Sequence, residues 1–371
     1  MDAPPSKPRP VTRARWTRRT TLVLGLAAAG LGVAVSLAAL GVLPVELSHG
    51  VPLAAGLAVA GLAAGLAFRP PLFRRLLLPL LLALEAACVA LMWPDIRSAW
   101  MLHDAGGRPA AGPSFSLIEF NVWDDNADPA RTIRWLRAAN ADIIVLAEAR
   151  EPFIADLGKA FPDYPTFVTC SNRPYCGVVI LSRFKGRLLD GGWWIADGLN
   201  HPFGSLDHMA LAAVELDVPG AAGGMTPTPV IAVHLDRRGL SGVSNSQSLD
   251  LLAAVGRASG RRAAGLILAG DFNTSPWSPQ MRMLDEALRR TAGARRISVF
   301  APTWPSGSAF GALLSPPPFL AIDHVYLGCE WVSQRLAVGP DAGSDHRSLI
   351  ARFAAVSADV GCAARSLASG Q

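Results

Sequence analysis

The chain has 371 residues, 51% of them apolar and 17% charged, and its formal net charge at pH 7 is +5. Residues 1–111 contain 11 Lys or Arg against 5 Asp or Glu, whereas the remaining residues contain 23 against 24. The positive charge therefore lies in the N-terminal part. The rest of the chain lacks the basic surplus with which proteins grip a nucleic-acid backbone, which argues against that class of protein.

The first hundred residues are expected to form a membrane anchor. A transmembrane helix needs about 20 consecutive apolar residues. Three nearly charge-free runs approach or reach that length, and a cleaved signal peptide would explain only the first, so we predict about three spanning helices. These runs cover residues 21–43, 51–68 and 76–93. The predicted organisation is a basic cytoplasmic N-terminus over 1–20 and an anchor over 21–93.

Positive charges indicate the orientation of this anchor. Arginines precede the first and third runs, whereas the loop 44–50 between the first two runs has neither Lys nor Arg. Because cytoplasmic loops are enriched in Lys and Arg, the N-terminus and the second loop are predicted to face the cytoplasm. The third helix then leaves the large C-terminal domain on the extracytoplasmic side of the cytoplasmic membrane. The charges are Arg13, Arg15, Arg18 and Arg19, followed by Arg69, Arg74 and Arg75.

A segment rich in Gly, Pro and Ala, residues 94–113, is predicted to link the anchor to one large domain. That domain covers 114–356, and a tail over 357–371 follows it. Short apolar runs typical of strands alternate in it with helix-compatible stretches, and its length suffices for one substantial core. No repeat with a solenoid or propeller period is present. Helices are predicted over Pro129–Ala139, Gln247–Ser259 and Pro279–Arg290.

Polar residues stand at the ends of the apolar runs in this domain. Taken singly, such a residue is more often a turn or cap residue. Together, carboxylates, amides and imidazoles at strand ends suit a hard divalent cation and a phosphate ester, so the sequence indicates phosphoester chemistry. No motif for a Ser or Cys nucleophile is present, so no covalent intermediate is implied. The polar positions are Asn121, Glu148, His234, Gly270–Asn273, Ile322–His324 and Ser344–His346.

In this order, and together with Thr303–Trp304, these motifs resemble the endonuclease/exonuclease/phosphatase family. Its members include deoxyribonuclease I, the abasic-site endonucleases, neutral sphingomyelinases and inositol-polyphosphate 5-phosphatases. The resemblance covers about residues 112–356, and Gly177–Arg183 matches a strand that the family usually shows. It implies an α/β fold, a four-layer α/β/β/α sandwich of two packed mixed sheets, preceded here by about three transmembrane helices. Residues 114–356 would be its catalytic domain.

The resemblance also implies a metal site and an activated water. Glu148 would be the principal Mg²⁺ ligand, with Asn121 and Asp345 on the metal or on its waters. Mn²⁺ is compatible with the same oxygen-rich ligands. Asp271 would take the proton from the attacking water, and Asn273 would position that water.

Two histidines complete the implied site. Asp323 would orient His346, and this pair would contact the phosphoryl group or act as acid or base. His234 stands where the deoxyribonuclease and sphingomyelinase branches carry His and the abasic-site enzymes usually carry Tyr. Which imidazole is the acid stays open, because coupled groups resist a unique assignment.

These observations favour a membrane-anchored, Mg²⁺-dependent phosphoesterase that acts on a phosphorylated lipid or another cell-envelope phosphoester. Tethering to the bilayer raises the effective concentration of membrane-resident substrates. The layout, several N-terminal spans and an outward domain, is similar to the membrane-anchored bacterial group of the vancomycin-resistance J type, which implies a polyprenyl-pyrophosphate or other envelope substrate. The bilayer and the substrate are the expected partners, and no obligate protein partner is inferred.

Two other classes of function are considered. An anchored extracytoplasmic nuclease acting on DNA or RNA is the alternative, since His234 is compatible with it, although the near-neutral charge of the domain does not favour it. A binding or sensory module on an inactive scaffold is disfavoured, because such a module has little physical reason to keep clustered carboxylates.

The cysteines and remaining histidines leave further points open. Cys170 and Cys176 either close a small disulfide loop or are two unpaired thiols, and their spacing does not decide between these. His201, His208 and His324 are expected to be structural. The segments expected to shape the substrate pocket are 191–208, 236–245 and 302–319.

Overall fold

The computed structural model divides the chain into two compact units, Met1–Pro94 with Trp277–Pro279, and Asp95–Pro276 with Gln280–Gln371. Each unit is described by itself. The residues that the structure describes are 11–40, 42–43, 45–68, 73–105, 112–169, 177–195, 210–221, 223–235, 251–257, 259–307, 309, 316–356 and 362.

Some predictions lie outside the described residues. These are the Cys170–Cys176 disulfide, His201 and His208, and much of the three predicted pocket segments. Most of the predicted tail, 357–371, also lies outside them.

Three long helices dominate the first unit. They approach closely over small residues, since a Cβ at Gly32 would lie 3.0 Å from the side chain of Leu84. Large apolar side chains point outward instead; Val23 is 64% exposed and Leu53 is 60% exposed. The elements are α1 (Val11–Ala39), η1 (Val45–Gly50), α2 (Val51–Phe68), η2 (Phe73–Leu77) and α3 (Leu78–Ala105).

The prediction of about three spanning helices is wrong by the criterion of length and hydropathy. Among the described residues, one helix, Arg75–Trp100, is long and apolar enough to cross a membrane. The apolar parts of the other two, Gly25–Ala39 and Leu47–Ala63, are shorter. The helix of the first apolar run ends at Ala39, before the end of that run at Leu43, and residues 41 and 44 lie outside the described part of the chain.

The predicted linker, 94–113, is helical in its first part. α3 contains Pro94 and continues to Ala105, because the residues after Pro94 include good helix formers and no glycine. Glycine first occurs at Gly106 and Gly107, just beyond the end of the helix. Residues 94–105 of the predicted linker therefore belong to the helix.

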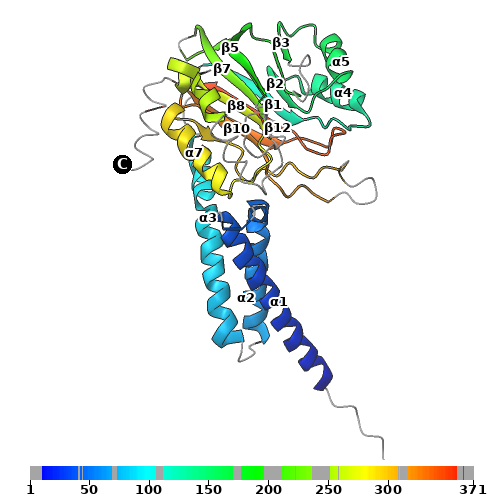
Figure 1. The fold of residues 1–371 in the computed structure, drawn as a ribbon, viewed down its shortest axis with the longest axis vertical. Coiled ribbons are helices and arrows are strands. Elements are labelled where there is room, and N and C mark those ends of the chain that lie inside the picture. The colour runs from blue at the N-terminus through cyan, green and yellow to red at the C-terminus, as the bar shows by residue number, and fades with distance from the viewer. Residues whose placement is uncertain are drawn as a thin grey trace, which may run out of the picture. The chain divides into compact units, whose positions relative to one another are not determined.

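Two six-stranded sheets form the second unit (Figure 1). Both are mixed, because β1 runs parallel to β2, and β7 parallel to β8, while the other pairs are antiparallel. The first sheet has the order β11 (Trp331–Val338), β12 (Leu349–Ala355), β1 (Ser114–Asn121), β2 (Ile143–Ala147), β4 (Val179–Ser182), β3 (Thr166–Thr169). The second has the order β5 (Gly186–Ile195), β6 (Ala210–Pro219), β7 (Met225–His234), β8 (Ile267–Asp271), β10 (Asp323–Leu327), β9 (Arg295–Arg296).

The sheets pack face to face, and helices cover their outer faces. One apolar cluster lies between them and contains Leu117 of β1 and Ala269 of β8. A second cluster joins the outer face of the first sheet to α4 (Pro129–Ala139) and α5 (Phe153–Ala160). A third joins the other sheet to α7 (Pro279–Ala292) and the helical residues 251–257. Figure 1 shows α4 and α5 on one side of the strands and α7 on the other. The expected α/β/β/α sandwich is thus present.

Two of the predicted helices have clear local causes. α4 covers the predicted residues; Asp128 caps it by accepting from the N–H of Arg131 at 3.0 Å, Pro129 opens it, and Asn140 ends it in a left-handed conformation. α7 begins at the predicted residue and ends two residues later, at Ala292. For the predicted helix Gln247–Ser259, the structure describes helix over 251–257. No prediction was made for η5 (Gly260–Gly265), which lies between the helical residues 251–257 and β8.

Candidate active site

The predicted polar residues gather at one edge of the two sheets. In the first sheet the parallel register of β1 and β2 places Asn121 beside Ala147, the residue before Glu148. In the second sheet the register pairs Asp271 with His234 across β7 and β8, and with Asp323 across β8 and β10. Because the carboxyl ends of parallel strands share one edge, residues far apart in the sequence meet there.

Two glycines allow these strand ends to approach each other. Gly270 has a φ of +154°, and a Cβ there would lie 1.8 Å from the carbonyl oxygen of Val233. Gly177 packs against Glu148, where a Cβ would lie 3.0 Å from the Cα atom. Glu148 adopts a left-handed conformation with φ 55°. Backbone strain of this kind costs about 1–3 kcal/mol and clusters at functional sites.

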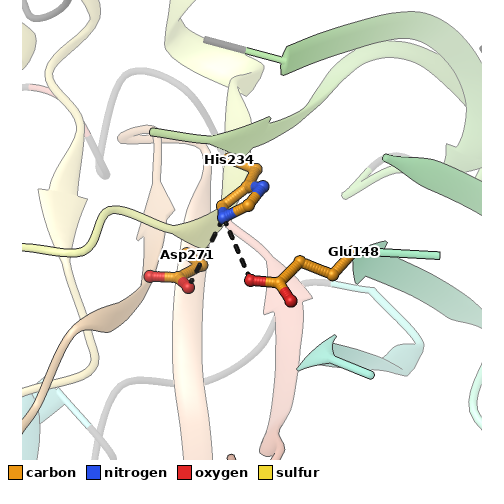
Figure 2. A group of neighbouring side chains, drawn as sticks. All are labelled: Glu148, His234 and Asp271. Carbon is orange, nitrogen blue, oxygen red and sulfur yellow. Dashed lines mark ion pairs between the residues drawn. The ribbon is translucent and has the colours of Figure 1, made fainter. Parts of the chain in front are cut away.

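Glu148, His234 and Asp271 form the outer part of the site (Figure 2). His234 Nε2 lies 3.4 Å from Glu148 Oε1 and 3.9 Å from Asp271 Oδ2. Asp271 is fully buried, whereas the side chains of His234 and Glu148 are 22% and 11% exposed. Solvent therefore reaches the group at His234 and Glu148, with Asp271 behind them.

Asn121 links the two carboxylates. Its Nδ2 donates to Glu148 Oε1 and to Asp271 Oδ2, both at 2.9 Å, and its Oδ1 accepts from the N–H of Trp123 at 2.9 Å. An amide nitrogen that donates in this way offers no lone pair to a metal. The contacts make Asn121 a spacer between the carboxylates, and its predicted place on the metal or its waters stays a prediction.

Burial and a second carboxylate raise the pKa of Asp271. Burial is the larger cause and Asp323 adds to it, while His346, His234 and the bond from Asn121 oppose them, and the pKa of Asp271 rises to about 6. A carboxylate with a pKa near the working pH is well suited to accept a proton. The position of Asp271 and its pKa are both compatible with the predicted role as the base.

Asp323 and His346 form the expected carboxylate–imidazole pair. Nδ1 of His346 lies 2.8 Å from Asp323 Oδ2, and Nε2 lies 3.8 Å from Asp271 Oδ2. Both residues are buried. Burial alone would lower the pKa of His346, but Asp323, followed by Asp271 and Asp345, outweighs it and raises the pKa to about 10. His346 is therefore protonated at neutral pH, as a general acid must be.

Asn273 and Asp345 lie on either side of this centre. The N–H of Asn273 donates to Asp271 Oδ1 at 2.7 Å, and its Nδ2 lies 3.4 Å from His234 Nε2, so it adjoins the base. Asp345 Oδ2 accepts from the indole N–H of Trp304 at 3.2 Å. Within the described part of the chain, Asp345 is in neither group of ligand atoms that lie within 4.8 Å of one another. Its predicted place on the metal stays a prediction.

Glu119 lies next to the site but belongs to none of the sequence motifs. It is fully buried in β1, and neither of its carboxylate oxygens has a hydrogen-bond partner. Burial, with Asp323 and Asp271 nearby, raises the pKa of Glu119 well above its ordinary value. Leu117 and Phe115, on the same face of β1, belong to the cluster between the sheets, so Glu119 lies beneath the site. An acidic residue in an otherwise apolar strand was the available signal.

The variant Glu119→Gln is expected to gain thermal stability over the native protein as the pH rises from 5 to 8. The unfolded glutamate ionises near its ordinary pKa of 4.5, whereas burial, with Asp323 and Asp271 nearby, holds the pKa of the folded one well above that value. Above that pH each further unit favours the unfolded native chain by up to about 1.4 kcal/mol, a cost that glutamine does not carry. Melting temperatures of both proteins across this range provide the measurement. Asp156→Asn, at an exposed carboxylate, is the control, and a constant difference for Glu119→Gln would contradict the assignment.

Cys329 and Cys362 form a disulfide, with Cα atoms 4.9 Å apart. The sequence offered no signal for this pairing, because the two residues stand 33 positions apart and outside any recognisable motif. Disulfides persist mainly in oxidising compartments such as the bacterial periplasm and the cell exterior.

The donor set fits a hard divalent cation. The carboxylates of Glu148 and Asp271 and the imidazole of His234 offer ligand atoms within 4.8 Å of one another. Oxygen-rich sites of this kind suit Mg²⁺ or Mn²⁺. A second group, Asp271, Asp323 and His346, satisfies the same distance, but its imidazole is already bonded to Asp323. Glu148, His234 and Asp271 are therefore the better candidates.

Known proteins resemble this chain over the domain that carries the site. Residues 118–346 match the model of the Endonuclease/Exonuclease/phosphatase family. Among curated proteins, none matches.

Solved structures similar to the chain are remote in sequence. One is an endonuclease/exonuclease/phosphatase from Beutenbergia cavernae DSM 12333, with 20% identity and a TM-score of 0.48 over 66% of this chain and 72% of that chain. A second, from Bacteroides vulgatus, has 14% identity and a TM-score of 0.48 over 66% of this chain and 100% of that one. A third, D. rerio TDP2 complexed with a single-strand DNA product, has 16% identity and a TM-score of 0.46, covering 65% and 98%.

Proposed function

Since this chain belongs to the endonuclease/exonuclease/phosphatase family of phosphoester hydrolases, we propose that it is a membrane-anchored, Mg²⁺-dependent phosphoesterase with a phosphorylated lipid or another cell-envelope phosphoester as its substrate. The observation that carries the proposal is the meeting of Glu148, His234 and Asp271 with the Asp323–His346 pair at one edge of the sheets. These groups supply a cation site, a base and a protonated imidazole together.

Each of these residues has a separate role in an in-line attack by water on phosphorus. Asp271 accepts the proton of the water, and Asn273, bonded to Asp271 through its N–H, helps to place that water. His346, protonated and oriented by Asp323, donates to the phosphoryl group or to the leaving oxygen. A divalent ion held by Glu148, with His234 beside it, would supply charge neutralisation for the phosphoryl oxygens when bound.

Helix α3 supports the membrane anchor. The segment Arg75–Trp100 is long and apolar enough to cross a bilayer. Only 22% of its most apolar stretch of 18 residues is buried, whereas the core helix of a soluble protein would be mostly buried. The helices of the first unit pack over Ala residues together with Leu77, Leu81 and Leu84, approach closely at Gly32, and expose other Leu and Val side chains. That distribution is typical of transmembrane helices, which associate over small residues.

Charge and the disulfide support an extracytoplasmic location of the domain. Arg69, Arg74 and Arg75 precede α3, and cytoplasmic flanks of spanning helices are enriched in such residues. A domain that follows this helix then lies outside. The disulfide between Cys329 and Cys362 is compatible with that side, because thiols stay reduced in the cytoplasm.

The tether and the charge of the domain favour a lipid or envelope substrate over nucleic acid. Residues 112–371 contain 23 Lys or Arg and 24 Asp or Glu, so binding of a polyanion gains little from net charge. Confinement to the bilayer raises the effective concentration of a lipid substrate around the site.

Purified full-length protein in detergent with Mg²⁺ is expected to release phosphate from a polyprenyl pyrophosphate with a higher kcat/KM than it cleaves plasmid DNA or RNA. Phosphate release and gel electrophoresis measure the two reactions in the same buffer, with EDTA as the control for metal dependence. A higher kcat/KM on nucleic acid would assign the protein as an anchored nuclease instead. Activity that survives EDTA would contradict the metal-dependent mechanism.

A further inference from the structure

His324, the residue after Asp323, lies in the interior and makes two hydrogen bonds that the proposed chemistry does not use directly. Its Nε2 lies 3.1 Å from the carbonyl oxygen of Thr274, and its Nδ1 lies 3.0 Å from the hydroxyl of Ser298. His324 and Ser298 are fully buried. The imidazole therefore bridges β10 to the turn that follows β8.

The chemistry of the partners determines which nitrogen carries the proton. A carbonyl oxygen only accepts, so Nε2 of His324 donates to Thr274. Nδ1 is then the acceptor for the hydroxyl of Ser298, whose oxygen also accepts from the N–H of Val325 at 3.2 Å. Burial, with Arg296 adding to it, lowers the pKa of His324 well below its ordinary value, in agreement with a neutral ring. The bond to Thr274 therefore has a fixed direction.

The turn that His324 holds contains Asp271 and Asn273, the two residues that the proposed mechanism assigns to the attacking water. Asn273 adopts a left-handed conformation with φ 49°, which asparagine tolerates better than other residues with a Cβ but which is still less favoured than the ordinary regions. The N–H of Phe272 donates to the carbonyl of Ile322 at 2.9 Å on one side of Asn273. On the other side, the bond from His324 fixes Thr274. The backbone of Asn273 is thus clamped at both neighbours.

We propose that His324 is a positioning residue, which holds the Asp271–Thr274 turn so that Asn273 and Asp271 keep their places at the site. The proposal rests on the proposed function, since positioning is defined by the reaction of the water. It gives His324, which the sequence predicts to be structural, a role in the reaction. A group placed about 1 Å from its productive position can cost a hundredfold in rate, so a bond remote from the phosphate can control turnover.

Three variants of the full-length protein test this inference. His324→Leu removes the donor, while His324→Gln places an amide N–H near the position of Nε2 and can donate to Thr274. Tyr326→Phe is the matched control, because it removes a buried hydrogen bond of the same strand, to Asp285 at 2.6 Å, and keeps the ring that packs against Phe272 of the turn. Each variant is compared with the native protein by melting temperature, by kcat and KM, and by hydrogen exchange.

We expect His324→Leu to lower kcat about a hundredfold with KM within about threefold, and His324→Gln to recover at least tenfold of that loss. Tyr326→Phe is expected to lower the melting temperature and keep kcat within about twofold. Equal kcat for His324→Leu and the native protein, or an equal loss in both His324 variants, would overturn the proposal.

Hydrogen exchange separates this inference from the proposed function, because it needs no activity. Amides of a peptide covering residues 272–276 are expected to exchange at least tenfold faster in His324→Leu, and not in Tyr326→Phe. Unchanged protection in His324→Leu overturns the positioning role even if no phosphoester is hydrolysed. If the native protein is inactive on all probes but protection falls, the proposed function fails and the structural restraint stands.

Discussion

Asp271→Asn is expected to lower kcat by about a thousandfold or more while the protein stays folded. Proton transfer by a positioned side chain contributes typically about 10²–10⁴-fold, and asparagine cannot accept the proton of a water. The substitution keeps the size of the side chain and one of the two hydrogen bonds that it accepts, from Asn121 or from the N–H of Asn273. Steady-state kinetics with the substrate that the native protein prefers, at saturating Mg²⁺, provides the measurement.

The stability of Asp271→Asn separates loss of chemistry from loss of fold. The pKa of Asp271 is raised from 3.8 to about 6, so the folded state binds its proton more tightly than the unfolded state. Stability of the native protein therefore falls as pH rises from about 4 to 6, and the variant avoids that cost. We expect its melting temperature at pH 8 to equal or exceed that of the native protein.

Asp142→Asn is the matched control for this experiment. Asp142 stands just before the start of β2, at the sheet edge opposite the site, and its Oδ2 accepts from the N–H and the hydroxyl of Ser116, both at 2.8 Å. It should lose some stability and keep kcat within about twofold. Near-normal turnover by Asp271→Asn would show that another group accepts the proton.

The arrangement of the site could be anticipated to the extent that strand ends determine it. Asn121, Glu148, His234 and Asp271 each end an apolar run, and parallel pairing brings such ends to one edge. The pairing of Asp323 with His346 was implied by the family resemblance, and the two side chains lie 2.8 Å apart. The direction in which an amide points does not follow from a motif, and Asn121 turned its nitrogen to the carboxylates.

Residues outside the strand-end pattern were missed for physical reasons. Glu119 lies two positions before Asn121, and only the packing of both sheets shows that its face of β1 is covered. The partners of His324 are Thr274 and Ser298, which lie in two distant segments, so no local motif distinguishes it from an ordinary core histidine. The Cys329–Cys362 disulfide depends on where the chain returns after β12, which local spacing does not encode.

The ends of the helices in the first unit could not be predicted from the apolar runs alone. Apolar runs define where helices can lie, but helix ends are set by local chain chemistry. α1 extends into the arginine-containing residues before its apolar part, and α3 extends past Pro94 until the glycines at 106 and 107. The helices therefore do not begin and end where the apolar runs do.

His346→Gln is expected to lower kcat by about 10²–10⁴-fold, because glutamine can bond Asp323 but carries no proton to give at neutral pH. The variant also tests the charge of the imidazole. With a folded pKa raised to about 10, His346 stabilises the native protein fully below its unfolded pKa of 6.5 and loses that contribution as pH rises through 10. The melting temperature of the native protein should therefore fall over this range more steeply than that of the variant.

Asp323→Asn completes the test, because it keeps the imidazole and removes the carboxylate that raises its pKa most. The pKa of His346 should then fall, and the alkaline limb of the kcat/KM profile should move to lower pH by at least about one unit. Because the groups are coupled, the limb reports an apparent value for Asp271, Asp323 and His346 together. An alkaline limb at the same pH in the native protein and in Asp323→Asn would show that the acid is a group other than His346. His234, whose side chain is 22% exposed and lies beside Glu148, would then be the next residue to substitute.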